Sequence, residues 1–184
     1  MQERRRTSSD VAPIMRVVRA GSLALLLHGC GQEPAQDVTT KPVTSTPVYD
    51  YVALDGQHVS SITNRGKVAI VTIIATYDLA SQVVIRELSE VRARQRRPIS
   101  VLAVVLEAPK NAPLAEAFAA TMELRFPIAM ADMATLEDRG PFGRVAGVPT
   151  TIVLSPKGRE VWRHEGAVLA ADIEKAIAAA RRDV

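Results

Sequence analysis

Two almost continuous runs of apolar, mostly β-branched residues, 67–75 and 99–106, constrain the fold of this 184-residue chain more than any other feature. A strand with one face in water alternates apolar and polar residues, whereas a strand covered on both faces reads as a continuous apolar run. The segment between the two runs, 81–97, repeats apolar residues at helical spacing. Two buried strands joined by a helix predict an α/β fold with a parallel strand pair.

Shorter elements are expected on either side of this unit. The pair Asp55-Gly56 predicts a hairpin turn between strands at 51–54 and 58–60. Further along the chain the patterns predict helices and strands in alternation, namely helices at 112–124, 134–138 and 170–182 and strands at 127–130, 151–154 and 160–165. On the first of these helices we expect one buried side made of Leu114, Ala117, Phe118 and Thr121. The composition, 47% hydrophobic, suffices for one compact core.

Four arginines crowd the end of the helix expected at 81–97, at positions 92, 94, 96 and 97. Cations are favoured at the carboxyl end of a helix by its macrodipole, and Pro98 is expected to stop the helix. The cluster therefore has a structural explanation, and a role as a binding patch is the alternative.

The N-terminal segment resembles the signal peptide of bacterial lipoproteins. The only cysteine, Cys30, follows Leu27-His28-Gly29 and the apolar run 20–27. A run of about eight apolar residues is too short for a membrane-spanning helix, which needs roughly 20, so a cleaved signal fits better. The resemblance implies that residues 1–29 are removed and that Cys30 becomes the lipidated first residue. The alternative is a buried N-terminal helix that ends in Gly-Cys by chance.

The expected organisation has three parts. The signal peptide is expected at 1–29, with Met15 as an alternative start. Residues 30–47 then form the lipidated cysteine and a proline-rich, disordered tether, and residues 48–184 form one domain. Residues 1–29 hold five of the 23 basic residues and two of the 20 acidic ones, so the remainder carries 18 of each. A neutral mature chain gives no reason to expect a nucleic-acid partner.

Several short motifs occur in an order that is similar to one known family. They are Leu54-Asp55-Gly56, Gly66-Lys67-Val68, Ala75-Thr76, Phe126-Pro127-Ile128 with Asp132, Val148-Pro149-Thr150 and Lys157-Gly158. Residues 48–184 resemble the TlpA-type branch of the thioredoxin superfamily, the anchored thiol-disulfide oxidoreductases of the cell envelope. The resemblance implies a thioredoxin-like three-layer α/β/α sandwich with a mixed sheet and an N-terminal β-hairpin.

The chain departs from that family at the catalytic loop. The two cysteines of the family map onto Asp78 and Ser81, and the aromatic residue before the first of them maps onto Tyr77. Disulfide exchange needs a thiolate that attacks a sulfur, so neither residue can perform it. The supporting residues of the family are also replaced, since its buried carboxylate falls near Thr72, its second acidic residue at Val84 and its helix-kinking proline at Arg86.

The candidate site is therefore a vestigial active-site loop, made of Tyr77, Asp78, Leu79, Ala80 and Ser81 together with Val148 and Pro149. Asp78 is expected to cap the helix by accepting from the amide of Ala80 or Ser81, and a ligand-binding or acid-base role is the alternative. The resemblance implies a cis peptide at Val148-Pro149 that faces the loop. A groove there could bind an extended peptide without reacting with it, or Pro149 merely shapes the loop.

No cofactor and no metal site is expected, because His58 and His164 stand apart from any cysteine or other close histidine. Three functions stay open. The leading one is a redox-inactive protein- or peptide-binding or scaffold module, lipid-anchored with its domain in the periplasm, and Gly31 after Cys30 weakly favours the outer membrane. The alternatives are a non-thiol enzyme or thiol-disulfide pathway accessory that uses Asp78, Tyr77 and Ser81, and a structural subunit of an envelope complex.

Overall fold

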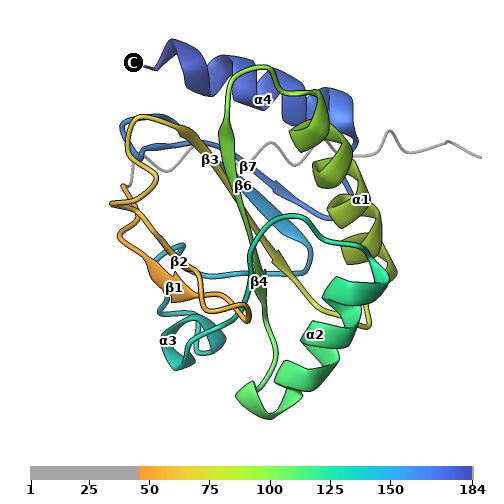
Figure 1. Ribbon diagram of the computed structural model, residues 1–184. Helices are drawn as coiled ribbons and strands as arrows, with labels where there is room; N and C mark the ends of the chain where they lie inside the picture. The colour runs from red at the N-terminus through yellow and green to blue at the C-terminus, as the bar shows by residue number, and fades with distance from the viewer. Residues whose placement is uncertain (1–45, 184) are drawn as a thin grey trace, which may run out of the picture. The chain divides into compact units, whose positions relative to one another are not determined.

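A five-stranded mixed sheet forms the centre of the structure, a computed structural model that describes residues 46–183 (Figure 1). Its strands are β3 (Val68–Ile74), β4 (Ile99–Val105), β5 (Ile128–Met130), β6 (Thr150–Leu154) and β7 (Glu160–Glu165). They lie in the order β5-β4-β3-β6-β7. β3, β4 and β5 run parallel, while β6 runs antiparallel to both β3 and β7. The expected mixed sheet is confirmed.

The central position of β3 explains its continuous apolar sequence. All seven of its residues are buried, because its side chains enter a core on each face of the sheet. Ile70 and Ile74 pack in the core under the long helices, whereas Val71 and Ile73 pack in the core on the opposite face. A strand that alternated polar residues would leave one of these cores with unpaired polar groups.

The two faces of the sheet are covered by different kinds of element. The helices α1 (Leu79–Arg94), α2 (Ala112–Thr121) and α4 (Ala170–Arg182) contribute to the core on one face, with a short 3-10 turn at Pro109–Asn111 before α2. The other face is covered by the hairpin of β1 (Asp50–Val52) and β2 (His58–Ser60), together with the one-turn helix α3 (Met133–Leu136), and Figure 1 shows these elements on the side away from α1. The second outer layer is therefore mostly hairpin and loop.

Two tyrosines and a strand-edge contact hold the hairpin in place. The Asn64 side-chain amide donates to the Tyr49 hydroxyl at 2.7 Å, and the hydroxyls of Tyr51 and Thr135 lie 2.9 Å apart. The N–H of Leu54 donates to the carbonyl of Ile128 at 2.8 Å, so the end of the hairpin also protects the edge strand β5. The expected N-terminal hairpin is confirmed, with its first strand at 50–52 rather than 51–54.

Two helix predictions are corrected. α1 ends at Arg94 rather than at position 97, because Gln95 is already extended (φ −72°, ψ 117°). The buried side of α2 is also different from the one expected, since Ala115 and Phe118 are buried while Leu114 is 58% exposed. α2 is alanine-rich on several sides, so the contact of Phe118 with the core decides the rotation of the helix.

The N-terminal predictions lie outside the described residues. These are the signal peptide 1–29, Cys30 with its lipid, the possible start at Met15 and all of the tether except its last two residues. Within residues 46–183, no helix combines the length and the apolar character that a membrane span requires.

Candidate functional site

Asp78 caps the helix that follows β3, as expected. Its backbone is extended (φ −92°, ψ 126°), and its carboxylate oxygen Oδ2 accepts from the N–H of Ser81 at 2.7 Å. The same oxygen accepts from the Ser81 hydroxyl, also at 2.7 Å. The first turn of a helix leaves N–H groups without partners, so a carboxylate at this position stabilises the helix both as an acceptor and as a charge.

Ser81 is buried completely and both roles of its hydroxyl are filled. The hydroxyl donates to Asp78 and accepts from the N–H of Ala75 at 3.3 Å. It thereby links the last residue of the strand run to the first turn of α1. A nucleophilic serine needs an exposed oxygen and a base that removes its proton, and Ser81 has neither exposure nor a neighbouring histidine in the sequence.

The outer surface of this turn is apolar. Tyr77 is 78% exposed and Leu79 is 76% exposed, although both could bury considerable apolar area. Ala80, the residue after Leu79, is half-buried. Two large apolar side chains exposed within three residues of each other can form part of a surface that binds another molecule.

The peptide bond between Val148 and Pro149 is cis, as expected. Pro149 is buried, and its carbonyl accepts from the N–H of Gly166 at 2.7 Å. Val148 is half-buried, and among residues 46–183 neither its N–H nor its carbonyl has a hydrogen-bond partner. The β3–β6 register ends with the pair of Ile73 and Thr150, so Val148 lies two residues before β6 at the edge where β3 ends, one residue before Ala75. The two halves of the candidate site therefore meet at the end of β3.

A buried ion pair fixes the segment that leads to Pro149. Arg163 on β7 donates to both carboxylate oxygens of Glu160, at 2.8 and 2.9 Å, and also to the carbonyl of Phe142 at 2.8 Å. An irregularity in the β6–β7 register lets Glu160 and Arg163, three residues apart, both be buried. Phe142 in turn packs against Tyr49, with ring centroids 5.3 Å apart. The backbone before Val148 is thus held by charge-assisted bonds from the sheet.

The sequence interpretation missed Glu107, whose carboxylate holds Thr76 of the turn by two hydrogen bonds. Its carboxylate oxygen Oε1 accepts from the N–H and from the hydroxyl of Thr76, both at 2.7 Å, and Oε2 accepts from Asn111 at 2.9 Å. Burial raises the pKa of the Glu107 carboxyl, but the bonds from Thr76 and Asn111 outweigh burial and lower that pKa below its ordinary value. The available signal was its place just after the buried run 99–106, at the edge where β3 and β4 end together.

Solved structures with the same arrangement of strands and helices include several thiol-disulfide proteins. A protein from Chlorobium tepidum named as a thiol:disulfide interchange protein DsbE matches with a TM-score of 0.64 and 21% identity, over 76% of this chain and 97% of its own. StoA from Bacillus subtilis matches with a TM-score of 0.60 and 18% identity, over 73% and 98%. The chain has a thioredoxin-like fold. No protein-family model and no curated protein matches the sequence.

A third match is a secreted disulfide oxidoreductase of Mycobacterium tuberculosis that is homologous to E. coli DsbE. Its TM-score is 0.58 and its identity 16%, over 71% of this chain and 95% of its own. The expected thioredoxin-like domain without a Cys-x-x-Cys pair is confirmed, since the sole cysteine of the chain is Cys30.

Three positions, Thr72, Val84 and Arg86, replace the residues that were expected to support thiol catalysis. Thr72 is fully buried, and its hydroxyl oxygen lies 3.2 Å from that of Thr151. Val84 is fully buried and apolar, and Arg86 is exposed on α1. None of these three positions therefore holds a buried carboxylate.

Among the described residues, no group of three or more His, Cys, Asp or Glu side chains is placed to hold a metal ion. The Nδ1 atom of His58 lies 3.7 Å from an oxygen of Asp50, at the surface. His164 stacks on Trp162, with ring centroids 5.6 Å apart and planes 6° from parallel, and its Nε2 atom lies 3.0 Å from the carbonyl of Ala167. Each histidine thus has a local role.

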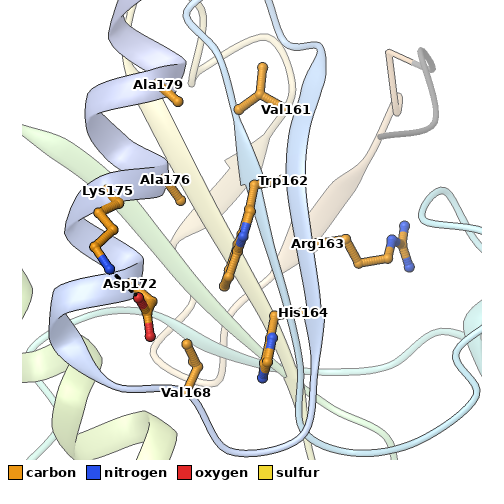
Figure 2. Close-up of a pocket in the computed structure, with 9 residues that line it drawn as sticks. All are labelled: Val161, Trp162, Arg163, His164, Val168, Asp172, Lys175, Ala176 and Ala179. Carbon is orange, nitrogen blue, oxygen red and sulfur yellow. Dashed lines mark hydrogen bonds and ion pairs between the residues drawn. The ribbon is translucent and has the colours of Figure 1, made fainter. Parts of the chain in front are cut away.

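The Trp162–His164 stack forms one wall of a hollow of about 400 Å³ between β7 and α4. Figure 2 shows the two rings on β7 facing the side chains of α4, with the ion pair of Asp172 and Lys175 at the rim. None of the predicted site residues lines this hollow. Nothing around it indicates what would fill it.

Proposed function

We propose that this protein is a redox-inactive, thioredoxin-fold lipoprotein of the bacterial cell envelope that binds an extended segment of another protein. The observation that carries the proposal is the backbone of Val148, whose N–H and carbonyl have no partner among the described residues and which lies just before β6, at the edge where β3 ends. An extended peptide could use both groups as an added strand would. The exposed side chains of Tyr77 and Leu79 could then cover its apolar residues.

The residues of the turn favour binding of a peptide without a thiol reaction. Thiol-disulfide exchange needs a thiolate, and the positions that would supply it hold Asp78 and Ser81. Their polar groups bond to each other and to the backbone. A non-thiol reaction would need at least one of them free to meet a substrate, so the enzymatic alternative is not favoured.

Placement in the envelope rests on the sequence and on the neighbours. The segment up to Cys30 resembles a lipoprotein signal, and one neighbour of the same fold is described as secreted. The partner in this proposal is an envelope protein or peptide, and the lipid on Cys30 supplies the membrane attachment.

Selection from a displayed peptide library, followed by NMR, tests the binding role. We expect bound peptides to shift the amide signal of Val148 and to lose roughly tenfold in affinity when Tyr77→Ala and Leu79→Ser are combined, about 1.4 kcal/mol. The matched control is Leu114→Ser with Leu169→Ser, which removes two exposed apolar side chains elsewhere. Peptides that shift only the residues between β7 and α4, or that bind both double variants equally, would show that the site lies elsewhere.

The same protein should not reduce insulin disulfides in the presence of a thiol donor. Turnover clearly above that of buffer would contradict the redox-inactive part of the proposal while leaving peptide binding to be judged separately.

A further inference from the structure

The end of the domain opposite the candidate site carries a basic hollow. It has a volume of about 280 Å³ and lies where β3, β4 and β5 begin. Lys67, Arg92 and Arg125 line it from three separate segments, the residue before β3, the last turn of α1 and the stretch before β5. All three side chains are exposed, none forms an ion pair with a described residue, and no carboxylate belongs to the lining.

More cations surround this hollow. Arg65, Arg96 and Arg97 are exposed at the same end, again without an ion pair to any residue in 46–183. Arg181 on α4 donates to the carbonyl of Arg97 at 3.2 Å and therefore brings a further guanidinium close by. By contrast, Arg94 is paired with Glu90 and Arg159 with Asp183. Glu90 and Glu123 line a neighbouring hollow with Arg92 and Arg125, but neither of these two arginines forms an ion pair with a described residue. This end therefore holds more cations than its ion pairs use.

The chain also enters the domain at this end. Thr46, the first described residue, lies beside Gly158 in the β6–β7 turn, 3.4 Å from where a Cβ on that glycine would be. Two residues earlier in the same turn, the carbonyl of Pro156 accepts from the N–H of Gly66 at 3.0 Å. Gly66 stands between Arg65 and Lys67. The first described residue therefore lies close to the segment that carries Arg65 and Lys67.

An exposed apolar residue lies in the same place. Ile62 is 76% exposed in the loop that leads to Arg65, whose N–H donates to the carbonyl of Ile62 at 3.2 Å. An apolar side chain flanked by cations matches the boundary between phosphate headgroups and acyl chains. A free phosphate ion would use the cations but would leave Ile62 without a role, and an acidic protein would not account for the position of the chain entry.

We propose that this end of the domain docks on an anionic phospholipid surface, with a headgroup phosphate held by Lys67, Arg92 and Arg125. The inference rests on the lipid anchor of the proposed function, which keeps the domain near the membrane. Each Lys or Arg close to an anionic surface strengthens binding roughly fivefold. The six unpaired cations at this end are enough to orient the tethered domain.

Docking of the basic end on the membrane would orient the candidate site relative to the bilayer. β3 begins at the basic end and finishes beside Ala75 and Val148, after seven residues that each rise about 3.3 Å. With the basic end on the bilayer, the turn at Tyr77 faces away from the membrane, roughly 20 Å or more above it. The peptide groove would then be open to envelope proteins.

Vesicle binding of the full chain tests the proposal with two variants of equal charge. The test variant combines Lys67→Gln, Arg92→Gln and Arg125→Gln, and the control combines Lys110→Gln, Arg139→Gln and Arg144→Gln, all of them exposed residues outside the basic end. Vesicles of phosphatidylcholine alone are compared with vesicles of equal parts phosphatidylcholine and phosphatidylglycerol. The apolar segment 20–27 is present in every protein, so its contribution cancels in the comparison.

We expect wild type and control to bind the anionic vesicles at least tenfold more tightly than the neutral ones, with a preference that declines as salt is added. The test variant should lose most of that preference while its thermal unfolding and its binding to neutral vesicles stay unchanged. Equal losses in test and control variants, or equal binding of wild type to both vesicles, would overturn the proposal. Displacement by inorganic phosphate beyond that by sodium chloride of equal ionic strength would also overturn it, in favour of a soluble phosphate site.

Failure here is separable from failure of the proposed function. The test variant keeps Tyr77, Val148 and their surroundings, so it should bind selected peptides in solution as wild type does. A variant that loses peptide binding without vesicles would signal a general defect, and the single variant Lys67→Glu would then repeat the vesicle comparison.

Discussion

The hydroxyl of Ser81 joins three parts of the turn after β3, namely the backbone of Ala75, the carboxylate of Asp78 and the start of α1. Each of these groups is at least partly withdrawn from water. A buried donor or acceptor that loses its partner costs more than the bond contributes when it is made, so this one side chain has a large influence on local stability.

Ser81→Ala should therefore lower the free energy of unfolding by about 1–2 kcal/mol. The N–H of Ala75 would lose its acceptor, and the carboxylate of Asp78 would lose one of its two donors. Ser89→Ala on the same helix is the matched control. The Ser89 hydroxyl bonds only to the carbonyl of Ile85, so its loss should change stability by less than about 0.5 kcal/mol. Urea unfolding of the three proteins measures the difference, and equal effects of the two substitutions would contradict the role given to Ser81.

Glu107 should make stability depend on pH. Its pKa in the folded protein lies below the value in the unfolded chain, which is about 4.3. The carboxylate therefore stabilises the fold above that pH, and the contribution is lost as the pH falls through the folded-state pKa. Glu107→Gln should destabilise the protein by about 1–3 kcal/mol at neutral pH, since a Gln amide N–H₂ would face the donor of Asn111.

The difference in unfolding free energy between wild type and Glu107→Gln, measured from pH 7 to pH 3, gives the test. It should be constant near neutrality and should shrink below about pH 4.3. A difference that grows toward low pH would mean that the carboxyl is protonated more easily in the folded state, contrary to the bonds described.

Asp78 and Glu107 show what sequence reasoning can reach at the level of single residues. A helix cap is local, since the accepting aspartate and its donor Ser81 are three residues apart, and the pattern alone predicted a bond to Ala80 or Ser81. Glu107 meets Thr76 only because β3 and β4 end side by side. No spacing within the sequence signals a contact between residues that the fold brings together.

Among the elements, the buried strands were predicted closely and α2 was not. β3 and β4 read as continuous apolar runs because both of their faces are covered, and their short length and β-branched residues favour a strand over a buried helix. α2 has alanines on several sides, so its sequence is compatible with more than one rotation about the helix axis. The structure buries Ala115 and Phe118 and leaves Leu114 in water.

Two substitutions test which side of α2 faces the core. Phe118→Ala should cost about 3 kcal/mol, because it removes a buried ring from the core under the helices. Leu114→Ala should change stability by less than about 0.5 kcal/mol, since the side chain is 58% exposed. Denaturant unfolding compares them directly, and a cost for Leu114→Ala as large as that for Phe118→Ala would restore the rotation predicted from the sequence.

Across the whole molecule, opposite ends of one sheet carry different surfaces. The end of β3 bears the apolar turn with Tyr77 and Leu79, and its beginning bears the cations around Lys67. The chain enters at the second of these ends. Motif order and spacing predicted the fold itself, but they could not predict this polarity, because it depends on which loops the sheet brings to each edge.

We expect a lipid on Cys30 to attach the whole protein to the membrane. Cys30→Ala should leave the protein unlipidated and should release it from membranes, since one basic surface without an acyl chain binds only reversibly. Gly31→Ala, which keeps the cysteine, is the control. Fractionation of cells and mass spectrometry of the N-terminus provide the measurement, and retention of the Cys30→Ala protein in membranes would mean that the segment 20–27 itself holds it there.

The mutual hydrogen bond between Asp78 and Ser81 also limits how this protein could change over time. An intramolecular disulfide at this turn would need two cysteines, at positions 78 and 81. Asp78→Cys on its own removes the acceptor that caps α1, while Ser81→Cys on its own places a larger, weaker donor in a site with no free space. Every single-substitution path toward a Cys-x-x-Cys pair therefore crosses a less stable intermediate, so the bond between Asp78 and Ser81 favours a turn without thiols.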